Sequence, residues 1–303
     1  MKRKVVRHGS ATLTISLPSK WAKKFDIKQG DELEIEEEGS SLAISTEKYL
    51  KLNECEFVID PGTISYIRSI ISNSYKKGYD VINLKFEEPN VIVTIQKVVD
   101  GLLGYEIVEQ GQGYCIIKNV ASGLETEFES MLKKSFFMTL TMGEICLEDI
   151  NNKKLKNYEE IRQMKDNITK FTNFCKRLTN KAKKNLDSNS FAYLILWSLE
   201  KIANEYKYIY RYLSKHTTNQ LSKKTLDYFK NTNQLLRLYF DGFYKKDNKM
   251  IKNITTLKDQ YLYKDLYDVL KQTKHLDSVV IHHLANIIRR VYDMTGPYFG
   301  IYL

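Results

Sequence analysis

The sequence predicts an α+β protein of several domains, with a small β-rich unit first, a mixed α/β segment next and a long helical region last. Three observations lead to this prediction. Apolar and polar residues alternate near the N-terminus, strand-like and helix-like segments are mixed over residues 53–120, and proline is absent from residue 125 until Pro297. The length of 303 residues fits two or three domains of ~100–150 residues each.

The first unit spans residues 1–48 and is predicted to be rich in β-structure. Residues 11–17 (ATLTISL) alternate apolar and polar side chains, the period of a half-buried strand, and KRKVVR is expected to pair with them across a turn at residues 8–10. Pro18 suits the first turn of a short helix in which Trp21 and Phe25 share the buried face. The alternating segments ELEIE and LAIS complete the order strand, strand, helix, strand, strand.

The second segment, residues 53–120, is predicted to be a small α/β subdomain. CEFVID and VINLKF are strand-like, and the helical periodicity between them ends at Gly78, a position typical of a helix stop. VIVTIQKVVDGLLG is ambiguous, because its β-branched start favours a strand and its length favours a helix. We predict a helix that stops at Gly101 or Gly104. YEIVEQGQGYCIIKNV is predicted to form a hairpin about residues 110–113.

The third segment, residues 125–303, is predicted to be entirely helical. Glycine is rare in it, and lysine, glutamate, leucine, asparagine and tyrosine dominate its composition. Polar breaks divide it into six predicted helices that span residues 125–150, 153–185, 189–215, 221–246, 248–271 and 275–296. The first three helices and the last three have comparable lengths. This weak internal repeat predicts two three-helix bundles packed together.

Positive charge is concentrated at the start of the chain. The formal net charge is +10 and the isoelectric point is about 9.1. These values alone do not decide whether the protein binds nucleic acid, binds anionic lipid or has no anionic partner. Residues 1–30 hold eight basic side chains and one acidic side chain, whereas the following DELEIEEEGSSLAISTE holds seven acidic and no basic ones. Such segregation predicts a small domain with one positive face and one negative face.

Three features occur together in residues 3–46: an alternating strand that leads into Leu17-Pro18, a short helix with Trp21, and the turn IKQGD before another alternating strand. In this combination the segment resembles the AbrB/SpoVT/MazE family of DNA-binding domains. The resemblance implies a swapped-hairpin β-barrel made by two chains, with basic residues of both chains on one DNA-facing surface. A unit of fewer than ~60 residues is also marginally stable alone, so its size favours the same homodimer.

The resemblance implies that the basic residues of this unit contact DNA. Cations held on one rigid surface release counterions from phosphates, and arginine can bond a guanine edge twice whereas lysine suits phosphate. The expected DNA-contacting residues are Arg3, Lys4, Arg7, Ser10, Thr12, Lys20, Lys23 and Lys24. The alternative interpretation is a solvated basic face on a dimerisation module, and for the isolated Lys28 we prefer that alternative.

The helical region carries a second resemblance. It rests on the doubled three-helix pattern and on MKDNITKFTNFCKRL (164–178), WSLEKIANEYKYI (197–209) and HHLANIIRRVYDMTG (282–296). With this order and spacing the region resembles the phosphate-uptake regulator PhoU, and the whole chain resembles an archaeal-type architecture that joins both domains. The resemblance implies a link to phosphate uptake, with a phosphate transporter ATPase or a sensor kinase as partner.

PhoU-like bundles hold clustered metal ions through E-x-x-x-D motifs, and this sequence departs from that pattern. Asn204 stands four residues after Glu200, and Ala285 stands eight residues before Asp293, where the pattern has acids. Asp166 lies between Lys165 and Asn167. Asp166, Glu200 and Asp293 therefore remain weak candidates for metal ligands, and we expect them to be solvated or salt-bridged. No cofactor is expected.

Several function classes find no support in the sequence. No nucleophile elbow, P-loop, dinucleotide-binding loop or HExxH motif is recognisable, so we do not expect an enzyme. No apolar run reaches the ~18 residues of a membrane span, and the basic N-terminus lacks the apolar core of a signal peptide. Four cysteines without CxxC spacing favour free buried thiols. We therefore expect a cytoplasmic protein.

Two functions fit these observations best, and a metal-storage or metal-sensing bundle is a third, weaker alternative. The first is a DNA-binding transcriptional regulator whose paired N-terminal units bind an operator while the helical region dimerises or receives a signal. The alternative is an adaptor that does not bind DNA, in which the helical region binds a transporter or kinase and the N-terminal unit only dimerises. AbrB-like units also occur in toxin–antitoxin pairs, although the rest of the chain is short and not helical there.

Overall fold

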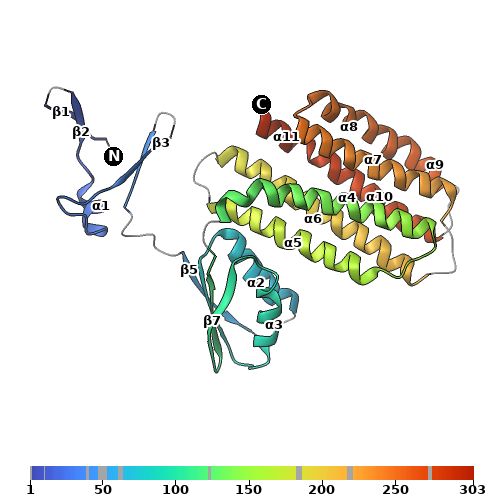
Figure 1. The fold of residues 1–303 in the computed structure, drawn as a ribbon, viewed down its shortest axis with the longest axis horizontal. Helices are drawn as coiled ribbons and strands as arrows, with labels where there is room; N and C mark the ends of the chain where they lie inside the picture. The colour runs from blue at the N-terminus through green and yellow to red at the C-terminus, as the bar shows by residue number, and fades with distance from the viewer. Residues whose placement is uncertain are drawn as a thin grey trace. The chain divides into compact units, whose positions relative to one another are not determined.

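The computed structural model describes residues 2–9, 11–38, 41–46, 53–60, 64–121, 124–181, 186–216, 221–271 and 275–303. The chain divides into two compact units, Met1–Leu52 and Asn53–Leu303. We call the first unit the head and the second unit the body, and describe each by itself (Figure 1).

The described residues of the head form four strands and one short helix in the predicted order. The elements are β1 (Val5–His8), β2 (Thr12–Ile15), α1 (Ser19–Lys24), β3 (Glu34–Glu38) and β4 (Ser41–Ser45). Strands β1 and β2 form one antiparallel pair, and β3 and β4 form another. The predicted turn at residues 8–10 contains Gly9, whose φ of 73° lies in the left-handed region that glycine adopts without steric cost.

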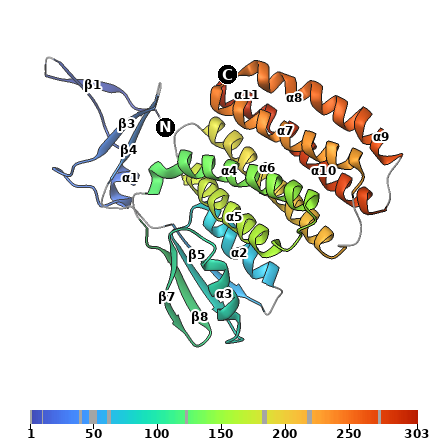
Figure 2. The same cartoon turned by 45° about the vertical axis from the view of Figure 1, so that its right-hand side comes forward.

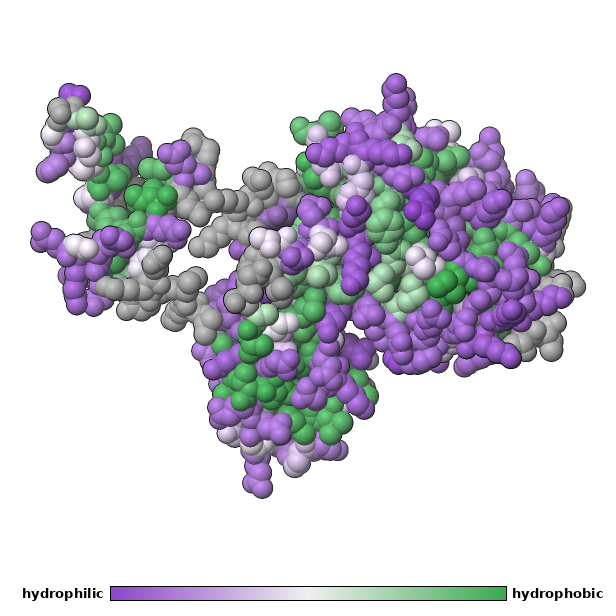
Figure 3. Space-filling model, viewed as in Figure 1, coloured by the Kyte–Doolittle hydropathy of each residue, from purple (hydrophilic) through white to green (hydrophobic). Residues whose placement is uncertain are grey.

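The strands of the head leave their apolar side chains in contact with solvent. Leu13 is 70% exposed and Leu42 is 63% exposed, and the space-filling view shows hydrophobic surface over these strands (Figure 3). Among the described residues of the head whose burial is defined, none is buried. A single copy therefore forms two separate hairpins, and the two-chain barrel remains a prediction.

The body begins with an α/β layer. Its elements are β5 (Glu54–Ile59), α2 (Ile64–Lys77), β6 (Val81–Phe86), α3 (Val91–Val99), β7 (Tyr105–Gly111) and β8 (Tyr114–Asn119). The strand order is β5-β6-β8-β7, with β5 parallel to β6 and the other pairs antiparallel. The predicted strands, the helix that stops before Gly78 and the hairpin are confirmed. The ambiguous segment is a helix, as we expected.

The remainder of the body is helical. Its elements are α4 (Phe128–Asn151), α5 (Tyr158–Lys181), α6 (Leu186–Ser214), α7 (Lys223–Lys245), α8 (Asn248–Gln260), α9 (Leu266–Leu270), α10 (His275–Asp293) and α11 (Thr295–Tyr302). A short 3-10 turn, η2 (Leu124–Glu127), precedes α4, and a π-helical turn, η3 (Tyr261–Asp265), joins α8 to α9. The six predicted spans correspond to α4, α5, α6, α7, the run from α8 to α9, and α10.

Several predicted helix boundaries differ from the structure, and for two of them the local cause is clear. Helix α5 begins at Tyr158 instead of residue 153, because Lys153 has a φ of 56° and the following residues form a connecting turn. Helix α10 ends at Asp293, and α11, which we did not predict, follows. Pro297 has no N–H to donate to the carbonyl of Asp293, so the helix is interrupted there and restarts at Thr295.

The helices form two groups of three that pack together (Figure 1). Helices α4, α5 and α6 are in mutual contact, as are α7, α8 and α10, and α6 packs against α10 between the groups. Gly143 lets α4 approach α6 closely, because a Cβ there would lie 2.8 Å from the Tyr206 ring. In the α/β layer, α2 and α3 are in contact, and α2 also packs against α5, so α2 joins the layer to the bundle (Figure 2).

Candidate nucleic-acid interface

The β1–β2 hairpin distributes the predicted DNA-contacting residues over two faces. Arg7 pairs with Leu13 and Val5 pairs with Ile15, so these four side chains share one face of the hairpin. Thr12 pairs with His8 and therefore lies on the opposite face. The hairpin thus does not bring Arg7 and Thr12 together on one face of a single copy.

Helix α1 places three predicted lysines on one exposed surface. It begins after Pro18 and ends at Lys24, and the centroids of the Trp21 and Phe25 rings lie 5.5 Å apart. Lys20, Lys23 and Lys24 are exposed, as expected for residues three and four positions apart on the opposite side of the helix. Lys23 and Lys24 lie in the last turn, where the helix dipole favours positive charge.

The remaining predicted residues lie on either side of β1. Arg3 and Lys4 precede the strand and are exposed, whereas Ser10 lies outside the described residues. Lys28 forms an exposed ion pair with Asp26, with 3.1 Å between Nζ and Oδ2. Among the described side chains, no carboxylate lies within ion-pair distance of the six predicted cations, Arg3, Lys4, Arg7, Lys20, Lys23 and Lys24.

Acidic side chains of the head lie on other elements than the basic ones. Strand β3 has the sequence EIEEE, whereas β1, α1 and the residues before β1 carry the cations. Glu34 and Glu37 are exposed. The charge segregation of the sequence is therefore also a segregation between secondary-structure elements.

A family model covers this unit. Residues 6–51 match the MazE family. The matching model is described as "Antidote-toxin recognition MazE, bacterial antitoxin", and the match ends before the body begins. No curated protein and no solved structure matches the chain. The MazE-like segment contains Arg7, Thr12 and the three lysines of α1, whereas Arg3 and Lys4 precede it.

The three weak metal candidates lie in the body, apart from the MazE-like segment, and each one is bound to a basic side chain. Asp166 pairs with Arg162 at 3.1 Å and Glu200 pairs with Lys176 at 2.7 Å, the latter with a lysine side chain that is only 2% exposed. Burial alone would raise the pKa of Glu200, but the neighbouring Lys176 ammonium lowers it overall. In the described part of the chain, no group of three or more His, Cys, Asp or Glu side chains is placed to hold a metal ion.

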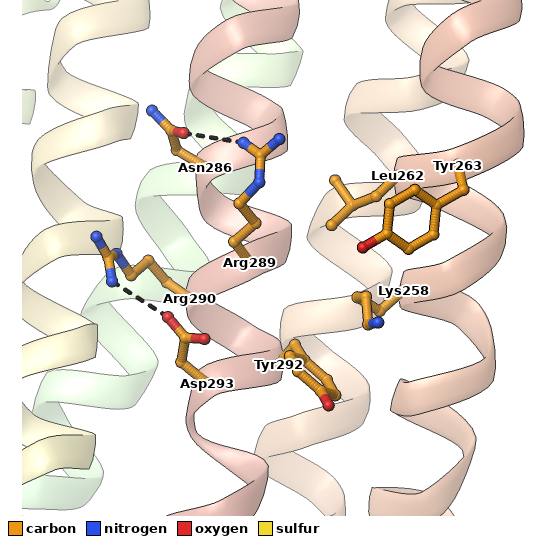
Figure 4. A pocket seen from close by; sticks show the side chains of 8 residues that line it. All are labelled: Lys258, Leu262, Tyr263, Asn286, Arg289, Arg290, Tyr292 and Asp293. Carbon is orange, nitrogen blue, oxygen red and sulfur yellow. Dashed lines mark hydrogen bonds and ion pairs between the residues drawn. The ribbon is translucent and has the colours of Figure 1, made fainter.

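Asp293 pairs with Arg290 at 3.1 Å and borders a cavity of about 250 Å³ between α8, η3 and α10 (Figure 4). Lys258 reaches between the rings of Tyr263 and Tyr292, with Nζ 4.4 Å from the centroid of the second ring. Arg289 also borders the cavity. Three cations around one carboxylate do not suit a metal cation, so these residues do not fit the PhoU-type metal centre.

No local sequence pattern indicates the buried polar contact between the α/β layer and α5. Arg177 is 3% exposed, and its guanidinium donates to Asp80 Oδ1 at 2.6 Å and to the carbonyls of Tyr75 and Tyr79. Lys181 donates to the same Asp80 oxygen at 2.7 Å. Burial by itself would raise the pKa of Asp80, but Lys181 and Arg177 together lower it. These partners are about a hundred positions apart in sequence, so only the fold brings them together.

Among the described helices, none is both long and apolar enough to cross a membrane. The four cysteines are free, and three of them are buried.

Proposed function

We propose that this protein is a DNA-binding transcriptional regulator whose head works as a pair of copies. The match of residues 6–51 to the MazE family carries the proposal. The exposed apolar side chains of the head support it, because a second copy would remove them from water at a gain of roughly 25 cal/mol per Å² of apolar surface.

In the proposed dimer, two copies of α1 present Lys20, Lys23 and Lys24 to the phosphate backbone. Pairing doubles the number of cations and makes the surface two-fold symmetric, as a pseudo-palindromic operator requires. Arg3 and Arg7 are the proposed base-reading residues, because a guanidinium can bond a guanine edge through two N–H groups.

For the body we propose a signalling role linked to phosphate uptake or a related transport response. The support is the packing of α4, α5 and α6 against α7, α8 and α10, the doubled arrangement expected from the PhoU resemblance. The proposed partner of the body is a transporter ATPase or a sensor kinase.

Salt-dependent DNA binding tests the regulator function. We expect the full chain to bind fragments of its own promoter region with an affinity that falls steeply with added salt. Replacing Lys20, Lys23 and Lys24 with glutamine should reduce the slope of log K against log salt by about 1 for each phosphate that the variant no longer neutralises. Arg3→Ala with Arg7→Ala should also weaken discrimination between fragments. Lys28→Gln is the matched control, since Lys28 is already paired with Asp26.

An intact dimer whose DNA binding is unaffected by any of these substitutions would contradict the regulator function and favour the adaptor alternative. The description of the family model favours antitoxin activity as a second candidate function. That function predicts that a small protein toxin co-purifies with the chain in fixed stoichiometry and is lost when the head is altered. A regulator without a toxin partner predicts no such protein.

A further inference from the structure

A polar cleft of about 560 Å³ lies in the body between α2, the end of α3, α5 and α6. Faces of two helices contribute most of its walls. Arg68, Ser72 and Lys76 are four residues apart on α2, so they share one side of that helix. The second wall carries Lys165, Thr169 and Asn173, which are also four residues apart, on α5. Elsewhere α2 contributes apolar side chains such as Ile71 to the core, so the polar walls are a local feature.

Two polar groups on the α5 wall have no hydrogen-bond partner in the described protein. The hydroxyl group of Thr169 is buried, and it neither donates nor accepts a hydrogen bond within the described protein. Asn173 is only 6% exposed, and its side-chain amide makes no hydrogen bond to a described residue. Buried polar groups in folded proteins are nearly always satisfied, so the Thr169 hydroxyl indicates a polar partner in this cleft, and the nearly buried Asn173 amide offers further hydrogen-bonding groups on the same wall.

Cations outnumber carboxylates around the cleft. The lining contains five cations, Arg68, Lys76, Lys97, Lys165 and Lys170, and three carboxylates, Asp100, Asp166 and Glu200. Asp166 is paired with Arg162, which lies outside the lining, and also with Lys165 of the lining, whereas Glu200 is paired with Lys176 outside the lining. The cleft therefore has an excess of positive charge.

Lys76 is a cation of the cleft without a carboxylate partner in the described protein. Among the described residues, no carboxylate lies within ion-pair distance of it. Its pKa is lowered, first because the amine is partly buried and second because the ammonium of Lys176 is close. An anion held in the cleft would offset both effects.

We propose that this cleft binds a small polyanion carrying phosphoryl groups, such as pyrophosphate or a sugar bisphosphate. Amine, amide and hydroxyl donors from two helices are the groups that bind phosphoryl oxygens. The volume lies in the range of ligand sites, ~300–1,000 Å³, and exceeds the space that inorganic phosphate needs. The described lining has no aromatic side chain, so a nucleobase would find no ring to stack on. The site goes beyond the proposed DNA binding and does not depend on it.

Calorimetry on the full chain at constant ionic strength tests the proposal, with inorganic phosphate, pyrophosphate, fructose 1,6-bisphosphate and ATP as probes. We expect saturable binding of pyrophosphate or the bisphosphate, weaker binding of inorganic phosphate, and no preference for ATP over pyrophosphate. Lys76→Gln with Lys165→Gln should weaken binding by roughly tenfold to a hundredfold for each lysine, as expected when a charge-assisted hydrogen bond is removed. The ligand-free variant should melt at a temperature close to that of the parent, because Asp166 and Glu200 keep Arg162 and Lys176 as ion-pair partners.

Two controls separate this site from other cationic surfaces. Lys249→Gln with Lys252→Gln makes the same change of charge on exposed positions of α8 and should leave binding unchanged. Glutamine at Lys20, Lys23 and Lys24 should also leave it unchanged, since these residues belong to the head. Equal binding by the cleft variant and the α8 variant, or no saturable binding of any probe, would overturn the proposal. Binding of ATP at least about tenfold tighter than pyrophosphate would overturn the assignment to phosphoryl groups alone.

Discussion

In the head, Leu13 and Ile35 of neighbouring hairpins are more than half exposed, whereas in the body side chains of the same kind, such as Ile71 and Leu236, are fully buried. Both regions contain alternating or periodic apolar residues. The difference is that the body supplies two layers that cover each other, the α/β layer and the bundle, while the described part of one head supplies two strand pairs and a six-residue helix.

This difference indicates that the two regions gain stability in different ways. A core such as that around Phe136, which lies within about 6 Å of four aromatic rings, stabilises the body within a single chain. No described residue of the head whose burial is defined is buried, and in our proposal a second copy supplies the missing burial. Four experiments test whether head and body differ in this way.

The largest effect is expected for Leu13→Gln in the head. If a second copy covers Leu13, the substitution should raise the dimer dissociation constant by about 100-fold or more, because two buried leucines contribute ~3–6 kcal/mol. Sedimentation velocity over a dilution series measures this change. Val58→Gln is the control, since Val58 is 63% exposed on the sheet of the body. Dissociation by Val58→Gln and not by Leu13→Gln would place the dimer contact in the body.

In the body, Arg177→Met should lower the free energy of unfolding by about 3–5 kcal/mol. The variant leaves Asp80 with Lys181 as its remaining ion-pair partner and removes donors from the carbonyls of Tyr75 and Tyr79. Denaturant unfolding of the full chain, followed by helical circular dichroism, measures the loss. The exposed pair Arg237–Glu144 is the control, and Arg237→Met should cost less than ~1 kcal/mol. Equal effects of the two substitutions would show that the buried contact does not hold the layer to the bundle.

Acid should weaken the body through Asp80. The pKa of Asp80 is lower in the folded protein than its ordinary value of 3.8. Its stabilising contribution is therefore complete above that value and is lost as the pH falls through the folded-state pKa. Urea midpoints at about pH 5 and about pH 3 should differ less in Asp80→Asn than in the parent. The same acid dependence in both proteins would assign it to other carboxylates.

The smallest effect concerns thiol reactivity, which reports on the body alone because the head has no cysteine. Burial raises the pKa of Cys115 to about 11 and that of Cys175 to about 12, so both thiols should react slowly with iodoacetamide in the folded protein. Cys55 is less buried and should react first. Mass spectrometry measures the alkylation rate of each thiol. We expect Leu13→Gln to leave these rates unchanged and Arg177→Met to increase the rate at Cys175. Faster alkylation of these cysteines in Leu13→Gln would show that the head stabilises the body.

Much of the secondary structure could be predicted from local patterns, because strand alternation, helix periodicity and stop residues such as Gly78 act over a few positions. The end of α10 was missed although Pro297 was visible, since a proline can end a helix or interrupt it, and only packing of α11 against α6 decides between these. For the candidate interface, the lysines of α1 follow from helix periodicity. The opposite orientation of Arg7 and Thr12 follows only from the register of β1 and β2.

Composition and short-range spacing were enough to establish the order of the elements and the basic start of the chain, and they led to the prediction that the head pairs with a second copy. Packing of the folded chain was needed to establish that Arg177 meets Asp80, that the candidate acids are bound to basic side chains, and that polar faces of α2 and α5 enclose a cationic cleft. Contacts between α2 and α5 join helices about a hundred residues apart in the chain. Local periodicity states which face of a helix is polar, but it carries no information about which other polar face lies opposite.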